Sequence, residues 1–281
     1  MRIGSSSYSF KRFNYGGTEG EEEKTLLEII DEAPKYGLDG LELLAVQFAS
    51  EERQYINELK QKAAANALDI YALSLHHNFV NPDPEVRNQQ VEFVLRWLDH
   101  AEALGAPLVR VFGGRWGTVS NFIDLMARNG LEDPLPGYEY AEGVKWNVEA
   151  FKRCAEKAAD LGIILALENH WGLTYSAQGV LDILEGVNSP ALKVALDCGN
   201  FLENTYEQIG MLVPHTVLVH AKCYHGGGIF YTLDIDYPKV IRMLKDVGFN
   251  GYLSIEYEGK ANPQTAIPAQ VQLLEQAIRM S

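Results

Sequence analysis

Residues 160–168 read DLGIILALE, and the order of structure in this stretch decides the fold. A helical pattern ends at Gly162, and an apolar run typical of a buried strand follows at once. Glycine suits the position after a helix because it adopts a positive φ without steric cost. The same order recurs in KYGLDGLELL, ALGAPLVRVF and DVGFNGYLSIE, at residues 35–44, 103–112 and 246–256. The chain therefore repeats a unit of strand and helix.

Eight strands are predicted, and a helical pattern follows each one. The helices show apolar residues three and four positions apart, as at Val91, Val94, Leu95 and Leu98. Because parallel strands need helical crossovers, eight such units predict an α/β fold, a single (β/α)8 TIM barrel, with a doubly wound sheet as the alternative. The predicted strands are residues 3–9, 40–44, 70–76, 108–112, 163–168, 193–197, 217–222 and 252–257.

No linker or break in composition divides the chain, so we expect one TIM-barrel domain over residues 1–281. Two segments look like additions to it. Residues 118–140 form a long insertion after the fourth strand, on the face where barrel enzymes act, and could form a lid. Residues 14–23 (NYGGTEGEEE) predict a loop followed by glutamates at a helix N-terminus.

Composition and charge exclude several classes of protein. The chain has 281 residues, of which 47% are hydrophobic and 22% charged, as in a soluble folded protein. Its net charge of −14 argues against nucleic acid or an anionic membrane as a partner. We see no apolar run near the ~20 residues that span a bilayer, and no secretory signal. The three cysteines show no CxxC spacing, which predicts free thiols and a cytoplasmic location.

The last four predicted strands end in residues that can bind a metal. Alternate residues of a barrel strand point inward, and the C-terminal strand ends form the active site. This alternation turns Glu168, Asp197, His220 and Glu256 inward, whereas Val217 should face the helices. Three buried carboxylates repel one another, and a divalent cation relieves that repulsion. Such a donor set favours Mn²⁺, Mg²⁺ or Co²⁺, and Zn²⁺ remains a candidate.

Other inward polar residues could hold substrate hydroxyls, although each could instead form a structural ion pair or a rim hydrogen bond. His77 competes with His76 for this role, because a bulge at the strand end would reverse the alternation. Trp116 and Trp171 are candidates for walls of the pocket. The candidates for substrate binding are Glu42, His76, Arg110, His170 and Lys222.

Four segments resemble a known family. ENHWG (168–172), LDCGNF (196–201), HAK (220–222) and SIEYEG (254–259) are similar to signatures of the xylose isomerase-like sugar isomerase/epimerase superfamily. That group includes tagatose 3-epimerase-like enzymes, hydroxypyruvate isomerases, inosose dehydratases and endonuclease IV. The resemblance covers nearly the whole chain and implies a xylose isomerase-like TIM barrel.

The resemblance also implies roles for single residues. Glu168, Asp197, His220 and Glu256 would be the ligands of one divalent metal ion. One position departs from the family pattern, because Asn200 stands where epimerase-like members often carry a histidine. Asparagine cannot carry a proton and is a poor metal ligand, so we assign it to substrate binding. The change leaves the three-zinc centre of endonuclease IV incomplete, and it argues against a ketohexose 3-epimerase.

The first functional hypothesis is a metal-dependent isomerase or epimerase acting on a sugar or small hydroxycarbonyl compound. Glu168 and Glu256 would exchange a proton α to a carbonyl, while the cation stabilises the enediolate. The alternative is a metal-dependent lyase or dehydratase acting on a keto-sugar, keto-inositol or keto-glycoside, with His170 or Lys222 as an extra acid. A non-catalytic sugar-binding barrel is the third hypothesis. A homo-oligomer is compatible with all three.

Overall fold

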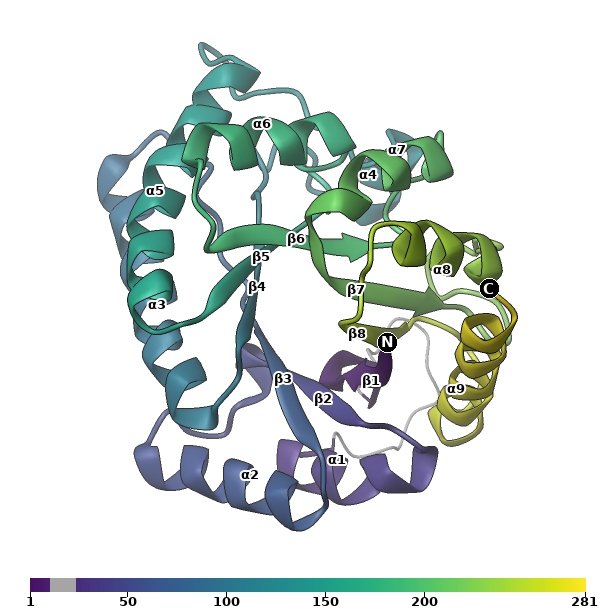
Figure 1. Cartoon of the computed structure of the whole chain (residues 1–281). Coiled ribbons are helices and arrows are strands. Elements are labelled where there is room, and N and C mark those ends of the chain that lie inside the picture. The colour runs from purple at the N-terminus through teal and green to yellow at the C-terminus, as the bar shows by residue number, and fades with distance from the viewer. Residues whose placement is uncertain (11–23) are drawn as a thin grey trace.

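A closed barrel of parallel strands forms the centre of the protein in the computed structural model, which describes residues 1–10 and 24–281 (Figure 1). Each strand pairs with the next along the chain, and the eighth pairs with the first. The predicted (β/α)8 barrel is confirmed. Within the described residues the strands are β1 (Arg2–Ser6), β2 (Gly40–Leu44), β3 (Asp69–Ser74), β4 (Leu108–Phe112), β5 (Ile164–Glu168), β6 (Leu192–Asp197), β7 (Thr216–Cys223) and β8 (Tyr252–Tyr257).

Helices surround the barrel as an outer ring (Figure 1). The glycines predicted to end helices, at positions 37, 105, 162 and 248, all have positive φ. At the end of α3, for example, the Gly105 amide donates to the Ala101 carbonyl at 2.9 Å. The described helices are α1 (Leu26–Glu32), α2 (Arg53–Ala65), α3 (Pro84–Leu104), α4 (Phe122–Ala127), α5 (Tyr140–Asp160), α6 (Ala177–Val187), α7 (Thr205–Leu212), α8 (Tyr237–Asp246) and α9 (Pro263–Met280).

The first strand is shorter than predicted. It ends at Ser6, and residues Ser7–Phe10 form a 3₁₀ turn at the mouth of the barrel. The Ser9 hydroxyl bonds backbone groups of β8 that a longer first strand would have paired. It donates to the Ile255 carbonyl at 2.9 Å and accepts from the Tyr257 amide at 3.0 Å. The turn brings the Tyr8 ring toward the cavity described below. The loop predicted at residues 14–23 lies outside the described residues, apart from the helix start that follows it, where Thr25 caps α1.

Residues 118–140 contain the short helix α4 and are held by a buried carboxylate. Glu132 accepts from the Arg115 guanidinium at 2.9 Å and from the amides of Gly117 and Val119 at 3.1 and 3.2 Å. An ionised carboxylate with several donors can remain buried at little cost. The segment is therefore tied to the end of β4 over the C-terminal mouth of the barrel.

Apolar side chains form two layers on either side of the strands. The outer layer lies between strands and helices and contains Leu165 and Leu167, as the alternation predicted. The inner layer is small and contains Tyr71, Ala72, Ala166, Ala195 and Leu218.

The prediction that Val217 faces the helices is wrong. Thr216 pairs with Val194 and Leu218 with Ala195, so Val217 is an extra residue in β7 and packs against the inner layer. This bulge precedes His220, and beyond it Leu218 and His220 both point inward.

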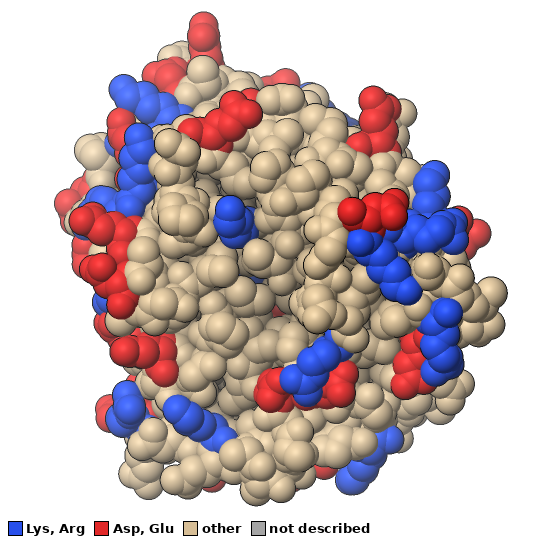
Figure 2. Space-filling model, in the orientation of Figure 1, with Lys and Arg blue, Asp and Glu red and all other residues tan. Residues whose placement is uncertain are grey.

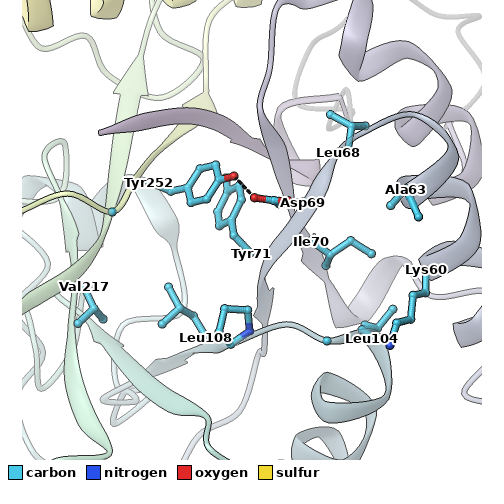
Figure 3. Close-up of a pocket in the computed structure, with 14 residues that line it drawn as sticks. Lys60, Ala63, Leu68, Asp69, Ile70, Tyr71, Leu104, Leu108, Val217 and Tyr252 are labelled. Atoms are coloured by element: carbon cyan, nitrogen blue, oxygen red, sulfur yellow. Dashed lines mark hydrogen bonds between the residues drawn. The ribbon is translucent and has the colours of Figure 1, made fainter.

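The N-terminal end of the barrel holds a mostly apolar pocket of about 500 Å³ (Figure 3). Tyr71 stacks on Tyr252 there, with ring centroids 3.9 Å apart. The Tyr252 hydroxyl donates to Asp69 Oδ2 at 2.7 Å, as the dashed line in Figure 3 marks. The Tyr71 ring reaches into the barrel past Gly4, where a Cβ would overlap it, and past Gly40, where a Cβ would overlap the Asp69 carbonyl oxygen. The floor of the barrel is therefore a packed aromatic pair.

Acidic and basic side chains are mixed at the edge of the face seen in Figure 2, and most of the centre of that face is uncharged. Among the described residues, no helix combines the length and the apolar character that crossing a membrane requires.

We expect Gly4→Ala to lower the free energy of unfolding by about 1–3 kcal/mol, because the new methyl group would overlap the Tyr71 ring. Urea denaturation followed by circular dichroism measures the change. Gly210→Ala is the matched control. Gly210 lies in α7, and a methyl group there would contact Met243 at an ordinary distance of 3.5 Å. The control should be neutral or stabilising by up to about 1 kcal/mol. Equal effects of both substitutions would contradict the packed floor.

Candidate active site

A cavity of about 390 Å³ lies at the C-terminal ends of the strands. Polar side chains from β4, β5, β7 and β8 form one part of its lining, and aromatic side chains form the rest. Phe122 of α4 packs against Trp171 and Phe230 with centroids 4.4 Å away, so the inserted segment covers part of the cavity. Trp171 is thus a wall residue, whereas Trp116 packs in a separate apolar cluster with Trp146.

Three of the four predicted metal ligands, all carboxylates, converge on one ring nitrogen of the fourth, His220. His220 Nδ1 lies 3.7 Å from Glu168 Oε1, 3.9 Å from Asp197 Oδ2 and 4.0 Å from Glu256 Oε1. Glu168, Asp197 and His220 each offer one ligand atom, and these three atoms lie within 4.8 Å of one another. His220 Nδ1 and Asp197 Oδ2 are buried and make no hydrogen bond within the described part of the chain, although the Lys222 ammonium lies 3.1 Å from Asp197 Oδ2. Buried ligand atoms that face a common point fit a bound cation.

The opposite side of the His220 ring faces Glu42. Its Nε2 lies 3.0 Å from Glu42 Oε2 and 3.1 Å from Oε1. Burial would raise the pKa of Glu42, but the His220 charge and hydrogen bond lower it to about 2. Burial opposes the charge of His220, yet Glu42, Glu256 and Glu168 together hold the pKa of the ring well above its usual value. Glu42 is completely buried and lies beneath the cavity rather than on its wall.

Lys222 neutralises the acidic residues on the other side of the site. Its Nζ lies 3.1 Å from Asp197 Oδ2, 3.2 Å from Glu256 Oε2 and 3.3 Å from Glu258 Oε1. These carboxylates raise the pKa of Lys222 despite its burial, which would lower it. Burial raises the pKa of Asp197 to about 8 even though Lys222 opposes the shift, because Glu256 and Glu168 add to it.

Arg110 has the same function for Glu168. The two side chains form a buried ion pair, with Arg110 Nε 3.2 Å from Glu168 Oε2. The guanidinium also donates to the Leu75 carbonyl at 2.8 Å and lies over the Phe112 ring. Burial would raise the pKa of Glu168, but Arg110 and then His220 hold it well below the usual range. Glu168 is therefore ionised at neutral pH.

Two histidines line the cavity as neutral groups. Burial lowers the pKa of His170 to about 4, whereas His76 is more exposed, and partial loss of hydration and the Arg110 charge lower its pKa. Both rings lie against Phe112, with centroids 5.4 and 4.5 Å away. His77, the predicted competitor of His76, turns the other way and packs against Phe79 at 4.4 Å. The strand-end alternation thus continues to His76.

Glu258 was not among the predicted site residues. It lies two residues beyond Glu256 on the cavity wall, accepts from Lys222 at 3.3 Å and from the Tyr8 hydroxyl at 3.4 Å, and is buried. Burial raises the pKa of Glu258. The same alternation that identified Glu256 could have found it. Tyr8 also lines the cavity and lies within the predicted first strand, two residues beyond the observed end of β1 at Ser6, whereas Tyr231 lies outside the strands and had no such signal.

A family model described as the xylose isomerase-like TIM barrel matches residues 30–277. The chain belongs to this family. A relative from Rhizobium meliloti, the rhizopine catabolism protein MocC, is 24% identical over 232 residues, which are 72% of this chain and 69% of the relative.

Solved structures similar to this family member include sugar epimerases. D-psicose 3-epimerase from Clostridium cellulolyticum H10, with D-tagatose, gives a TM-score of 0.77 at 18% identity and covers 99% of both chains. The 3-keto-D-glucoside 4-epimerase of E. coli gives 0.75 at 14% identity, covering 98% of this chain and 99% of that one. At these identities the likeness establishes the shared fold.

Asn200 connects the two halves of the site. Its amide nitrogen donates to Glu168 Oε1 at 3.2 Å and to the Asn169 carbonyl at 3.1 Å. Its amide oxygen accepts from Lys222 Nζ at 2.9 Å. A side-chain amide both donates and accepts, so it contacts a carboxylate and an ammonium at once. Asn200 thereby holds Glu168 and Lys222 in fixed relative positions.

We expect His77→Leu to reduce the acid sensitivity of this family member. Burial lowers the pKa of His77 to about 3, so the unfolded chain gains a proton below pH ~6.5 that the folded chain does not bind. The stability that a neutral His77 contributes is complete above pH ~6.5 and is lost as pH falls toward 3.

Between pH 7 and pH 5 that loss amounts to about 2 kcal/mol at most. Urea denaturation of wild type and His77→Leu at pH 7, 6 and 5 tests it. The wild-type stability should fall more steeply with acid than that of the variant. Parallel pH profiles would show that the environment of His77 has no part in acid sensitivity.

Proposed function

We propose that the protein is a divalent-metal-dependent sugar isomerase or epimerase. The observation that carries this proposal is the convergence of Glu168, Asp197 and Glu256 on His220 Nδ1, with separations of 3.7 to 4.0 Å. Two of the four residues, Glu168 and Glu256, also line the cavity. Acids that both bind a cation and face a substrate cavity suit proton transfer next to a carbonyl group.

Glu168, Asp197, His220 and Glu256 would hold the cation. A carboxylate-rich donor set with one imidazole favours Mn²⁺, Mg²⁺ or Co²⁺ and also accepts Zn²⁺. When bound, the cation supplies positive charge that stabilises developing negative charge on substrate oxygens. The residues of the chain carry out the remaining steps.

Glu168 and Glu256 would exchange the proton. Arg110 keeps Glu168 ionised, as a base must be, and Asn200 fixes the position of its Oε1. Glu256 would return the proton from its own strand end, either to the opposite face of the same carbon or to the neighbouring carbon. The first course gives an epimer and the second an isomer.

The cavity suits a single sugar unit. Its volume of about 390 Å³ falls within the range of small-molecule sites. His76 and His170 are neutral near pH 7 and can donate to and accept from hydroxyl groups. Lys222 and Arg110 can stabilise oxyanion charge, while Phe112 and Trp171 can pack against the apolar face of a sugar ring.

Solvent-deuterium exchange tests this proposal. Wild type with a panel of keto-sugars in D₂O should give carbon-bound deuterium by NMR, and Glu168→Gln and Glu256→Gln should each slow its uptake by about 10²–10⁴-fold. Elemental analysis should find near-stoichiometric Mn, Mg, Co or Zn in wild type. The metal content of each variant then shows how much of its slower deuterium uptake results from lost metal.

Glu132→Gln is the control, because Glu132 is a buried glutamate bonded only within residues 115–132 and outside the metal cluster. Its metal content should match wild type. A wild-type protein that binds no divalent metal after reloading would contradict the proposal. Deuterium uptake that is unchanged by both substitutions would show that Glu168 and Glu256 are not the acid–base pair.

A lyase or dehydratase is the second candidate, and Glu258 favours it. The acid that expels a β-hydroxyl or glycosidic group must be protonated and face the substrate. Glu258 lines the cavity, and burial raises its pKa, while the Lys222 ammonium 3.3 Å away opposes that shift.

Glu258→Gln separates the two candidates when deuterium uptake and product release are both followed by NMR. In a lyase we expect loss of product with uptake retained, because proton abstraction precedes departure of the leaving group. In an epimerase both should change together.

A further inference from the structure

A column of hydrogen-bonded side chains runs through the barrel beneath the candidate metal centre. At its base the Tyr71 hydroxyl donates to Ser254 Oγ at 2.7 Å. The Ser254 hydroxyl donates to Glu42 Oε2 at 2.7 Å, and Glu42 contacts His220 Nε2 at 3.0 Å. All four side chains are buried, and Figure 3 shows the Tyr71 ring beside Tyr252 in the pocket at the N-terminal end. The column links the aromatic floor to the imidazole.

Both carboxylate oxygens of Glu42 are fully engaged. Oε1 accepts from the Ser74 hydroxyl and Oε2 from the Ser254 hydroxyl, while His220 Nε2 lies within 3.1 Å of both. The Glu42 side chain is 0% exposed and does not line the cavity. A sugar hydroxyl therefore has no access to Glu42 and no free oxygen position to use.

We propose that Glu42 is a positioning residue that orients His220 and fixes its tautomer for metal binding. An ionised carboxylate only accepts hydrogen bonds, so the ring nitrogen that faces it must carry the hydrogen. Nε2 is that nitrogen. The hydrogen that the ring gives up to a cation is then the one on Nδ1, which leaves the Nδ1 lone pair directed at Glu168, Asp197 and Glu256.

The two serines keep Glu42 in its role as an acceptor. The hydroxyls of Ser74 and Ser254 both donate to Glu42. Glu42 therefore remains the acceptor for the Nε2 hydrogen of His220. A half-turn of the imidazole about its Cβ–Cγ bond would exchange each ring nitrogen with a ring carbon, so the ring would lose both the Nε2 contact with Glu42 and the cation-binding nitrogen. The inference rests on the proposed function only in requiring that His220 bind a divalent cation.

Metal affinity tests the inference without any substrate. Glu42→Gln keeps the shape of the side chain, but its amide can also donate, so the constraint on the His220 tautomer is lost. Calorimetric titration with Mn²⁺ should give a dissociation constant about 10–100 times weaker than that of wild type. In Zn²⁺-loaded protein, ¹⁵N NMR of His220 should show hydrogen at Nε2 in wild type and a changed tautomer signature in the variant.

Tyr71→Phe is the matched control. It removes one buried hydrogen bond from the same column but leaves the Glu42–His220 contact intact. Its Mn²⁺ affinity should stay within about threefold of wild type, even if its thermal stability falls. Ser254→Ala keeps the Glu42 carboxylate and removes one hydrogen bond to it, so it should weaken Mn²⁺ binding less than Glu42→Gln does. This variant replaces Glu42→Gln in the test if Glu42→Gln does not fold.

The outcomes separate the inference from the proposed function. Mn²⁺ binding that is equal in wild type, Glu42→Gln and Ser254→Ala overturns the role of Glu42 and leaves the metal centre intact. A wild-type protein that binds no Mn²⁺ overturns the metal centre itself and the inference with it. Equal weakening by Glu42→Gln and Tyr71→Phe would mean that the column acts only through stability, which also overturns the inference.

Discussion

The structure depends on the need to pair buried charge at one end of the barrel. Five carboxylates, from Glu42, Glu168, Asp197, Glu256 and Glu258, lie buried within a few residues of the strand ends. An unpaired buried carboxylate is costly, because the barrel interior solvates charge poorly. Arg110, Lys222 and His220 therefore occupy fixed positions among them, at separations of 3.0 to 4.0 Å. These contacts set the orientation of nearly every polar side chain in the site.

The barrel itself supplies the rigidity that these contacts need. Small residues, Gly4 and Gly40 on the strands and the alanines of the inner layer, leave room for the Tyr71 ring at the N-terminal end. Stacking on Tyr252 holds that ring in place, and its hydroxyl begins the column that ends at His220. Between the two ends, the small apolar inner layer shares the barrel interior with the hydrogen-bonded Ser254 and Glu42 side chains. The packed floor and the charged mouth are thus one continuous structure, although they occupy opposite ends of the barrel.

Most of the barrel and the core of the site follow from the two-residue alternation of strands. That rule finds Glu168, Asp197, His220 and Glu256, and extended by two residues it finds Glu258. It fails at Val217, because a bulge depends on the register between neighbouring strands, which one sequence does not contain. The rule turns Glu42 inward but does not predict how far below the cavity its side chain lies, because that depth depends on how the strands are tilted and staggered. Tyr231 reaches the cavity from outside the strands, where no periodic pattern exists.

The balance of charge also explains why the residues of this centre suit a divalent cation better than further basic side chains. The acids of the cluster outnumber its permanently cationic groups, Arg110 and Lys222, and His220 adds a positive charge only when both ring nitrogens carry hydrogen. A cation at Nδ1 displaces one of those hydrogens and brings two charges in return, so metal binding should release a proton. That exchange relieves the repulsion that burial and its carboxylate neighbours impose on Asp197, while the Nε2 hydrogen stays with Glu42. Lys222 cannot achieve this alone, because its single charge is already shared among Asp197, Glu256 and Glu258.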